Sequence, residues 1–196
     1  MELSTGIPYR EEESLLIEKL ELGGGMSALD IGCGTGIFSR RFAALNPKSS
    51  IIGLDFSYNQ LRQAVAYRKQ DRLNNLSFVH GQAALLPFAG ATFDRAVTVG
   101  AMQFFGPIET FFEEAFRALK PGGIFVALNY LGLQYKKSQL PLAFLAQKAA
   151  DKHGDHLFSK DEITAAATAA GFCDIDYFEK EITFILKARK QVANKP

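Results

Sequence analysis

The chain has 196 residues and a formal net charge of +1 at pH 7, with 47% hydrophobic and 22% charged residues. These values are typical of one soluble globular domain, and the near-zero charge gives no overall field that would attract nucleic acid or an acidic membrane. The two cysteines fit a reducing cytoplasm, so we expect a cytoplasmic protein. The chain starts MELSTGIPYREEE, which is too acidic for a signal peptide. No apolar run reaches the roughly 18 residues of a membrane-spanning helix, so we expect no stable membrane insertion. Cys33 and Cys173 lack the spacing of a zinc or redox site, so we expect no metal site.

The first half of the chain alternates helical patterns with short apolar runs. Helical periodicity predicts three helices, with Ser57 as the N-cap of the third: 11–22, 35–45 and 57–72. Apolar runs predict four buried strands: 28–32, 50–55, 76–80 and 93–99. We expect a short helix between the third and fourth strands.

The second half continues this alternation and ends in two strands. An amphipathic helix over 107–120 is stopped by Pro-Gly-Gly, and a fifth strand follows over 124–129. After an irregular stretch with a helix near 139–152, a capping box from Ser159 to Glu162 begins a helix that ends at Gly171. The last two strands, 172–179 and 181–188, are too close for a crossover helix and should pair antiparallel.

This order predicts an α/β protein. We expect a Rossmann-like, seven-stranded, mostly parallel sheet with helices on both faces and an antiparallel last strand, with ligands at the carboxyl ends of the strands. Residues 1–196 would form a single domain. Its predicted parts are an N-terminal helical cap (1–25), a cofactor-binding core (26–130), a substrate lid (131–157), a C-terminal helix with a strand pair (158–189) and a tail (190–196). The tail should be disordered, with Lys187, Arg189 and Lys190 as a solvated chain end.

A glycine-rich loop follows the first predicted strand in the sequence DIGCGTG, residues 30–36. Glycines let a backbone turn sharply and approach a ligand, and the amides of the following helix can hold a carboxylate or a phosphate. Asp55 ends the second strand, 23 residues after Gly32, where an acid can accept both ribose hydroxyls. The pattern therefore indicates an adenosine-containing ligand. A nicotinamide fingerprint fits poorly, because its last glycine would fall on Ile37 or Ser39.

The segment LDIGCGTG resembles the first motif of the class I S-adenosylmethionine-dependent methyltransferases, and Asp55 matches the acid of their second motif. Three further segments are similar to this family: 80–88 with 92–94 to its adenine-side G-D-A-x-x-L-P-F…F-D, 117–123 to R-x-L-K-P-G-G, and 171–172 to A-G-F. The resemblance covers about residues 26–188 and includes, in general terms, the quinone-biosynthesis methyltransferases. One position departs, since Gln82 stands where the family commonly has an acid.

The resemblance implies S-adenosyl-L-methionine as cofactor and in-line methyl transfer to a small molecule at oxygen, carbon or another heteroatom. Asp30 and the loop from Gly32 to Gly36 would hold its amino-acid end, Asp55 the ribose, and Phe56 would flank the adenine, with Gln82 and the Ala83 amide at its edge. The expected cofactor-binding residues are Asp30, Gly32, Cys33, Gly34, Gly36, Asp55, Phe56, Gln82 and Ala83. Cys33 is interpreted as a small buried filler and not a reactive thiol.

The acceptor side has fewer signals. After the fourth strand the chain reads GAMQFF, residues 100–105, without the [DNS]-P-P-[YFW] of methyltransferases that act on amino nitrogens of bases or glutamine. The expected acceptor-binding residues are Tyr9, Phe104, Phe105, Tyr130 and Tyr135, with Leu140, Leu142 and Phe144 as further apolar lining. His153 or His156 would serve as a general base if one is needed. Their spacing also suits metal ligation with Asp151 and Asp155, although exposed histidines are the favoured interpretation.

Several alternatives remain. A module that binds the cofactor without catalysis is one, and a nicotinamide-dependent oxidoreductase on a similar fold is another. A third keeps the methyltransferase and makes its acceptor a lipid-like quinone precursor. Among single residues, Asp94 is expected to brace the fourth strand, and His80 to be a strand-end histidine and not a base.

Overall fold

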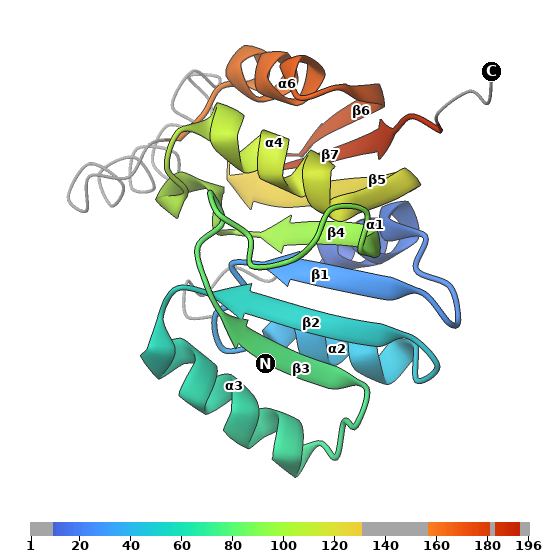
Figure 1. The fold of residues 1–196 in the computed structure, drawn as a ribbon, viewed down its shortest axis with the longest axis vertical. Coiled ribbons are helices and arrows are strands. Elements are labelled where there is room, and N and C mark those ends of the chain that lie inside the picture. The colour runs from blue at the N-terminus through green and yellow to red at the C-terminus, as the bar shows by residue number, and fades with distance from the viewer. Residues whose placement is uncertain (1–9, 131–156, 181–182, 193–196) are drawn as a thin grey trace.

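The computed structural model describes residues 10–130, 157–180 and 183–192 (Figure 1). The helices are α1 (Arg10–Leu20), α2 (Ile37–Leu45), α3 (Tyr58–Gln70), the short 3-10 helix η1 (Met102–Phe104), α4 (Ile108–Ala118) and α6 (Lys160–Ala169). The strands are β1 (Ser27–Ile31), β2 (Ser50–Asp55), β3 (Leu76–His80), β4 (Phe93–Val99), β5 (Leu119–Tyr130), β6 (Phe172–Lys180) and β7 (Thr183–Lys190). None of the helices in these ranges is long and apolar enough to cross a bilayer.

The seven strands form one sheet in the order β3-β2-β1-β4-β5-β7-β6. The first five of these pair in parallel, and β7 pairs antiparallel with both β5 and β6. The predicted fold class is therefore confirmed. The strand order reverses between β1 and β4, and in open α/β sheets ligands bind outside the carboxyl ends of the strands at such a point.

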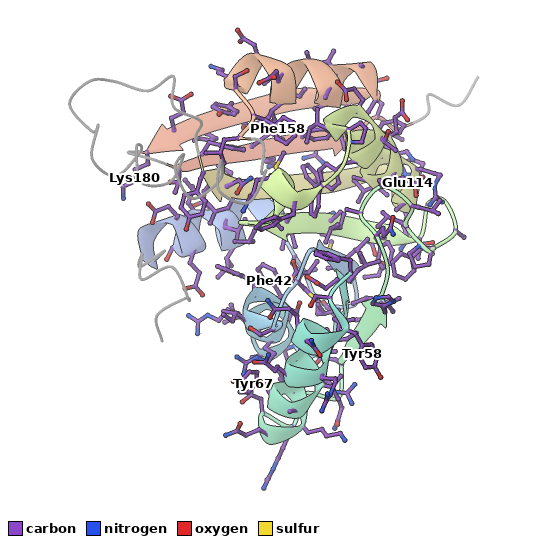
Figure 2. All side chains as sticks on the ribbon, turned by 90° about the vertical axis from the view of Figure 1, so that its left-hand side faces the viewer. Phe42, Tyr58, Tyr67, Glu114, Phe158 and Lys180 are labelled. Carbon is purple, nitrogen blue, oxygen red and sulfur yellow. The ribbon has the colours of Figure 1, made fainter. Side chains whose placement is uncertain are left out.

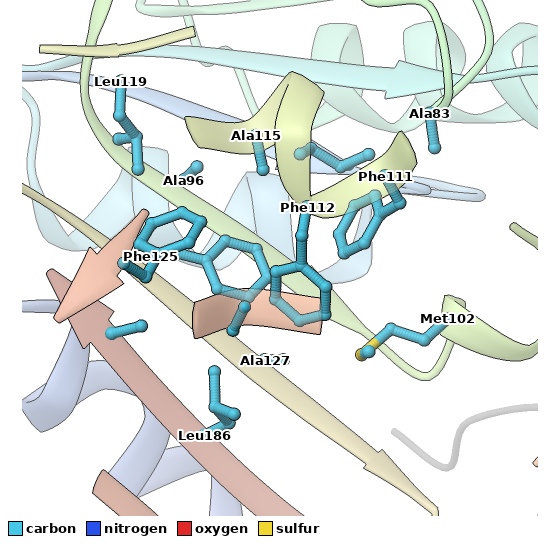
Figure 3. Close-up of a cluster of buried hydrophobic side chains, with 14 of the residues drawn as sticks. Ala83, Ala96, Met102, Phe111, Phe112, Ala115, Leu119, Phe125, Ala127 and Leu186 are labelled. Atoms are coloured by element: carbon cyan, nitrogen blue, oxygen red, sulfur yellow. The ribbon is translucent and has the colours of Figure 1, made fainter. Parts of the chain in front are cut away.

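Apolar side chains alternate between two layers, one on each face of the sheet. One layer joins the sheet to α1 and α2 through residues such as Leu16 and Phe42. The other joins it to α4 and α6, with Phe111, Phe112 and Phe125 at its centre (Figure 3). These three rings contact one another mainly edge to face, with centroids 5.2–5.8 Å apart. The packed layers fix the strand ends, and so they fix the positions of the loops that follow them.

The local sequence signals at two helix starts are confirmed. The Ser57 side chain accepts a hydrogen bond from the Gln60 amide at the start of α3. At α6, Ser159 and Glu162 form the predicted capping box in both directions. Each helix begins within about a turn of its expected position because the cap is encoded by neighbouring residues.

Three expectations were wrong. Residues 81–92 form turns and not a short helix between β3 and β4. The fifth strand begins at Leu119 rather than at 124, directly after α4, and η1 was not expected. Lys190 is not a solvated chain end: it lies in β7, and its Nζ donates to the carbonyls of Phe116 and Leu119 at 2.7 and 2.8 Å. Lys187 likewise forms an ion pair with Glu21. The helix expected near 139–152 lies outside the described residues.

Candidate functional site

The glycine loop leaves β1 at the reversal point of the sheet and enters α2. Gly32, Gly34 and Gly36 all have left-handed φ angles, 74°, 54° and 74°. The amides of Gly32 and Cys33 both donate to the carbonyl of Leu54, at 2.8 and 3.0 Å, which fastens the loop to the end of β2. The loop is thus a fixed turn over the carboxyl edge of the sheet.

The glycines at 32 and 34 have different surroundings. A Cβ at Gly32 would lie 2.6 Å from the Ala101 Cβ, so that glycine permits close packing against the segment after β4. A Cβ at Gly34 would meet nothing closer than the Gln60 Oε1 at 4.0 Å, so the space above this residue is open. The left-handed backbone at Gly34 therefore faces room for a ligand, as the cradle of a nucleoside-type cofactor requires.

The first turn of α2 stands beside this open space. Gly36 is the N-cap of α2 and offers no side-chain cap, and no acidic residue occupies the first turn, although the Ser39 amide already contributes a hydrogen bond to the Asp30 carboxyl. The first amides of a helix lack intrahelical partners and favour a negative group. The donor set therefore suits the carboxylate of an amino-acid tail.

Asp55 ends β2 and is buried, with 6% of its surface exposed. One carboxylate oxygen accepts from the Gly34 amide and the other from the Ser57 amide, each at 2.8 Å. Each oxygen has a further lone pair, so two hydroxyl donors can still be accepted. The backbone contacts hold this acceptor pair directly beside the open position at Gly34, which fits the expected ribose contact.

Asp30, on β1, is the second buried carboxyl group of the site, with 2% of its surface exposed. Burial is the main reason that its pKa is raised to about 7, an effect that the Asp55 charge adds to and the hydrogen bond from Ser39 opposes. That bond joins Ser39 Oγ to Asp30 Oδ2 at 2.5 Å. A cationic group bound nearby would stabilise the ionised form of Asp30, so the residue is suited to an ammonium.

Cys33 is half-buried within the loop. Burial raises the pKa of its thiol, and the negative charges of Asp30 and Asp55 raise it further. A thiol that stays protonated is a poor nucleophile. The interpretation of Cys33 as a small filler agrees with this environment.

The turns after β3 place the predicted adenine-side residues next to the end of β2. The Gly81 amide donates to the Asp55 carbonyl at 3.1 Å, and the His80 Nε2 lies 2.8 Å from the Phe56 carbonyl oxygen. Phe56 is 63% exposed at this edge, Gln82 is exposed, and Ala83 is buried. The missing charge at Gln82 is therefore at a solvated position, where a charge is strongly screened.

Sequence reasoning missed the residues that hold these turns. Arg117 on α4 donates to the carbonyls of Phe88 and Leu86, at 2.7 and 3.0 Å, and pairs with Glu114 at 2.6 Å. Glu114, which lies beside this loop (Figure 2), accepts from the Leu86 amide at 2.7 Å. We call Glu114 and Arg117 the loop clamp. The only sequence signal was the arginine of the R-x-L-K-P-G-G segment, which gave no hint of its partner.

On the acceptor side, the structure places three of the expected residues. Phe104 is 55% exposed after β4. Phe105 packs inward, its ring 4.6 Å from that of Phe111 and under Gly32, and so it supports the glycine loop. Tyr130 is the last residue of β5 and is partly buried. The remaining residues expected here lie outside the described part of the chain: Tyr9, Tyr135, Leu140, Leu142, Phe144, His153 and His156.

Two further residues have structural roles, as expected. Asp94 Oδ2 accepts from the Ser27 amide at 2.9 Å and from Lys120 Nζ at 2.8 Å, bracing the start of β4 against β1 and β5. Although partial burial opposes it, the bonds from Lys120 and Ser27 lower the pKa of Asp94 to about 2. His80 lies at the end of β3. Within the described ranges, no group of three His, Cys, Asp or Glu residues is placed to hold a metal.

Comparison with solved structures shows a common fold. The [4+2]-cyclase SpnF superposes with a TM-score of 0.79 at 20% identity, over 98% of this chain and 84% of that one. Phosphoethanolamine N-methyltransferase 2 of Haemonchus contortus, in complex with phosphomonomethylethanolamine and S-adenosylhomocysteine, gives 0.78 at 18% identity, over 92% of this chain and 52% of that one. At such identities the likeness concerns the fold.

Comparison of sequences is more specific. Residues 28–123 match the family described as a methyltransferase domain. An uncharacterised chloroplastic methyltransferase of Arabidopsis thaliana is 31% identical over 95% of this chain, which spans about half, 53%, of that relative. A demethylmenaquinone methyltransferase of Geobacillus sp. (strain WCH70) is 30% identical over 91% of this chain and 82% of the relative. The similarity thus extends well beyond the glycine loop, and the chain belongs to the S-adenosylmethionine-dependent methyltransferases.

Proposed function

We propose that this protein transfers a methyl group from S-adenosylmethionine to a small-molecule acceptor. The observation that supports the cofactor assignment best is the pairing of Gly34 with Asp55. The Gly34 amide fixes one oxygen of the Asp55 carboxylate at 2.8 Å, and the space where a Gly34 Cβ would stand is open. A buried acceptor pair next to uncovered backbone suits a ribose better than it suits a packed core.

The residues of this chain would bind and orient the two reactants. Asp55 accepts the ribose hydroxyls, the amides at the start of α2 receive the carboxylate of the methionine tail, and Asp30 offsets its ammonium. Phe56 and the turn at Gln82 and Ala83 enclose the adenine. When bound, S-adenosylmethionine supplies a methyl group activated by its sulfonium for in-line displacement. The work of the protein is therefore alignment, which can lower a barrier by about 7–11 kcal/mol.

A small acceptor is supported by the surface at the carboxyl edge and by the relatives. Phe104, which follows β4, is 55% exposed and offers apolar contact to a ring or chain. The relatives include demethylmenaquinone methyltransferases and 24-methylenesterol C-methyltransferase 3 of Arabidopsis thaliana, the latter 25% identical over 49% of its length. Both names denote acceptors with apolar ring systems. The two free thiols fit a reducing, cytoplasmic setting.

Calorimetric titration with S-adenosylhomocysteine tests the cofactor site. Asp55→Ala removes two charge-assisted contacts to the ribose and should weaken binding by about tenfold to a hundredfold. Ser57→Ala changes the neighbouring residue, whose side chain makes only a 3.4 Å cap bond, and should bind as the unmodified protein does. Equal affinities for the two variants would remove Asp55 from the site.

Turnover must be tested separately because the fold also serves other chemistry, as in the [4+2]-cyclase SpnF. The protein is incubated with radiolabelled S-adenosylmethionine and a metabolite extract, and the appearance of label in extractable small molecules is measured. Labelled product with the unmodified protein and not with Asp55→Ala is the expected result. Tight cofactor binding with no labelled product from any extract would favour a binding module without catalysis.

A further inference from the structure

Among the residues that the structure describes, three buried polar atoms near the carboxyl ends of β4 and β5 have no hydrogen-bond partner. They are the Thr98 Oγ1, the Gln103 Oε1 and the Asn129 Oδ1. Thr98 is fully buried and Asn129 is 3% exposed. Buried polar atoms in proteins are nearly always paired, and an unpaired one lowers stability, so each calls for a physical explanation.

Thr98 and Asn129 lie near the ends of β4 and β5, and Gln103 lies in η1 between β4 and α4. Thr98 is level with Ala127 in the sheet, and the Gly100 amide donates to the Leu128 carbonyl at 2.8 Å. Strand alternation therefore places Thr98 and Asn129 on the same face of the sheet, the face that α4 covers. Asn129 lies two residues beyond Ala127, the partner of Thr98, so the two side chains are diagonal neighbours on adjacent strands.

Gln103 reaches the same junction from η1. Its Nε2 donates to the Gly100 carbonyl at 2.9 Å, which holds the amide, and with it the unpaired Oε1, at the end of β4. Met102 beside it is fully buried against the phenylalanine layer (Figure 3), so η1 is anchored to the core. We call Thr98, Gln103 and Asn129 the polar trio.

The segment that follows β4 also contacts the glycine loop. A Cβ at Gly32 would lie 2.6 Å from the Ala101 Cβ and 3.0 Å from the Phe105 Cζ. Residues 101–105 therefore pack against the turn that would carry the methionine end of the cofactor. A ligand held by the polar trio would lie next to that end and away from the adenine side at Phe56.

We propose that an atom of the polar trio accepts a hydrogen bond from an O–H or N–H group of the methyl acceptor and so positions it. This inference rests on the proposed function, since it concerns the second reactant of the same site. The unpaired atoms are two amide carbonyl oxygens and a hydroxyl, all able to accept a hydrogen bond, and none is charged. They match a neutral hydroxyl or amine on the innermost part of the acceptor and discriminate against an analogue that lacks the donor.

Thermal unfolding of the ligand-free protein tests whether the trio is unpaired, using variants matched in chemistry. Thr98→Val and Asn129→Leu remove unpaired atoms and should leave Tm unchanged or raise it. Thr183→Val removes a buried hydroxyl that donates to the Lys180 carbonyl at 3.0 Å. Asn75→Leu removes an amide that donates to three carbonyls, those of Ala43, Asn46 and Ser49. These two controls should lower Tm by about 2–4 °C or more. Equal losses in all four variants would mean that the trio is already satisfied within the fold, and would overturn the proposal.

Side-chain amide NMR of the protein saturated with S-adenosylhomocysteine tests the ligand class, with phenol and fluorobenzene as probes. The Asn129 and Gln103 amide signals are assigned by their loss in Asn129→Leu and Gln103→Leu. Phenol should shift at least one of the two signals, and fluorobenzene, which has the same ring without a donor, should not. No shift with phenol, or equal shifts with both probes, would refute the inference. The titration with S-adenosylhomocysteine is read first, so a failure of cofactor binding is seen separately.

Discussion

The loop clamp depends on the side chain of one arginine, and Arg117→Ala tests how much that side chain contributes. The Arg117 guanidinium makes four hydrogen bonds: two to Glu114, at 2.6 and 2.8 Å, and two to the carbonyls of Phe88 and Leu86. Hydrogen bonds to a charged group contribute about 1.5–3 kcal/mol each when sheltered. The Arg117 side chain is 39% exposed, so solvent screening reduces this, and we expect a total loss of about 2–3 kcal/mol.

For a chain of this length, such a loss corresponds to a fall in Tm of about 5–10 °C. The S-adenosylhomocysteine affinity should fall as well, by about tenfold, because the turns that carry Gln82 and Ala83 are no longer held against α4. Calorimetry for binding and differential scanning fluorimetry for Tm measure the two effects. Arg117→Lys keeps the positive charge without the planar fork, and should recover only part of each loss.

Arg41→Ala is the matched control. Arg41 forms an ion pair with Glu13 at 2.8 Å, but its side chain is 58% exposed, and its removal should change stability by less than about 0.5 kcal/mol. If Arg117→Ala melts as Arg41→Ala does and binds S-adenosylhomocysteine normally, the clamp has no role in the site.

The stability difference between Arg117→Ala and the unmodified protein should also shrink in acid. Arg117 lowers the pKa of Glu114 below 4.5, so the pair stabilises the fold above that pH and is lost as the pH falls below it.

Three further predictions concern single residues. Burial raises the pKa of Asp30 from 3.8 to about 7, so the folded protein binds a proton more tightly than the unfolded chain does. This residue should therefore destabilise the ligand-free fold by about 3 kcal/mol as pH rises from 4 to 7. Asp30→Asn should abolish that loss in urea titrations across this pH range; an identical pH profile would contradict it. Asp94 has the opposite pH dependence, because its pKa is lowered from 3.8 to about 2. Asp94→Asn should therefore reduce the free energy of unfolding by about 2 kcal/mol at neutral pH and by little at pH 2, as acid titration followed by circular dichroism would show. Gly34→Ala should reduce S-adenosylhomocysteine affinity more than Gly25→Ala does, because both positions have a left-handed φ and open surroundings and only Gly34 faces the proposed ligand; equal calorimetric affinities would argue that no ligand approaches there.

Local signals in the sequence were sufficient for most of the fold. Ser57 and Ser159 cap their helices through residues three positions away, so their effect can be read from the sequence. The glycine loop and Asp55 were also predictable, because the end of a parallel strand fixes where the next residues lie. The pairing of β6 with β7 followed from their spacing alone.

The errors arose where distant residues decide the structure. The turns at 81–92 are held by Arg117, which lies about 30 positions later, and local periodicity does not encode that contact. Lys190 looked like part of a charged tail, yet its ammonium fits the carbonyls that α4 leaves unpaired at its C-terminal end. The polar trio was invisible for the same reason, since Thr98 and Asn129 become neighbours only through the register of β4 with β5.

The position of β7 has a consequence for how the sheet is assembled. Although β7 follows β6 along the chain, it lies between β5 and β6 and is the only strand that joins them. Until residues 183–190 pair, β5 has an open edge and β6 has no partner among the strands that the structure describes. The first five strands can associate in a growing chain, but an incomplete chain would present the unpaired N–H and C=O groups along the edge of β5 to any other strand that it meets. Interrupting β7 should therefore lead first to aggregation through β5, while the sheet of β1 to β5 stays folded for a time.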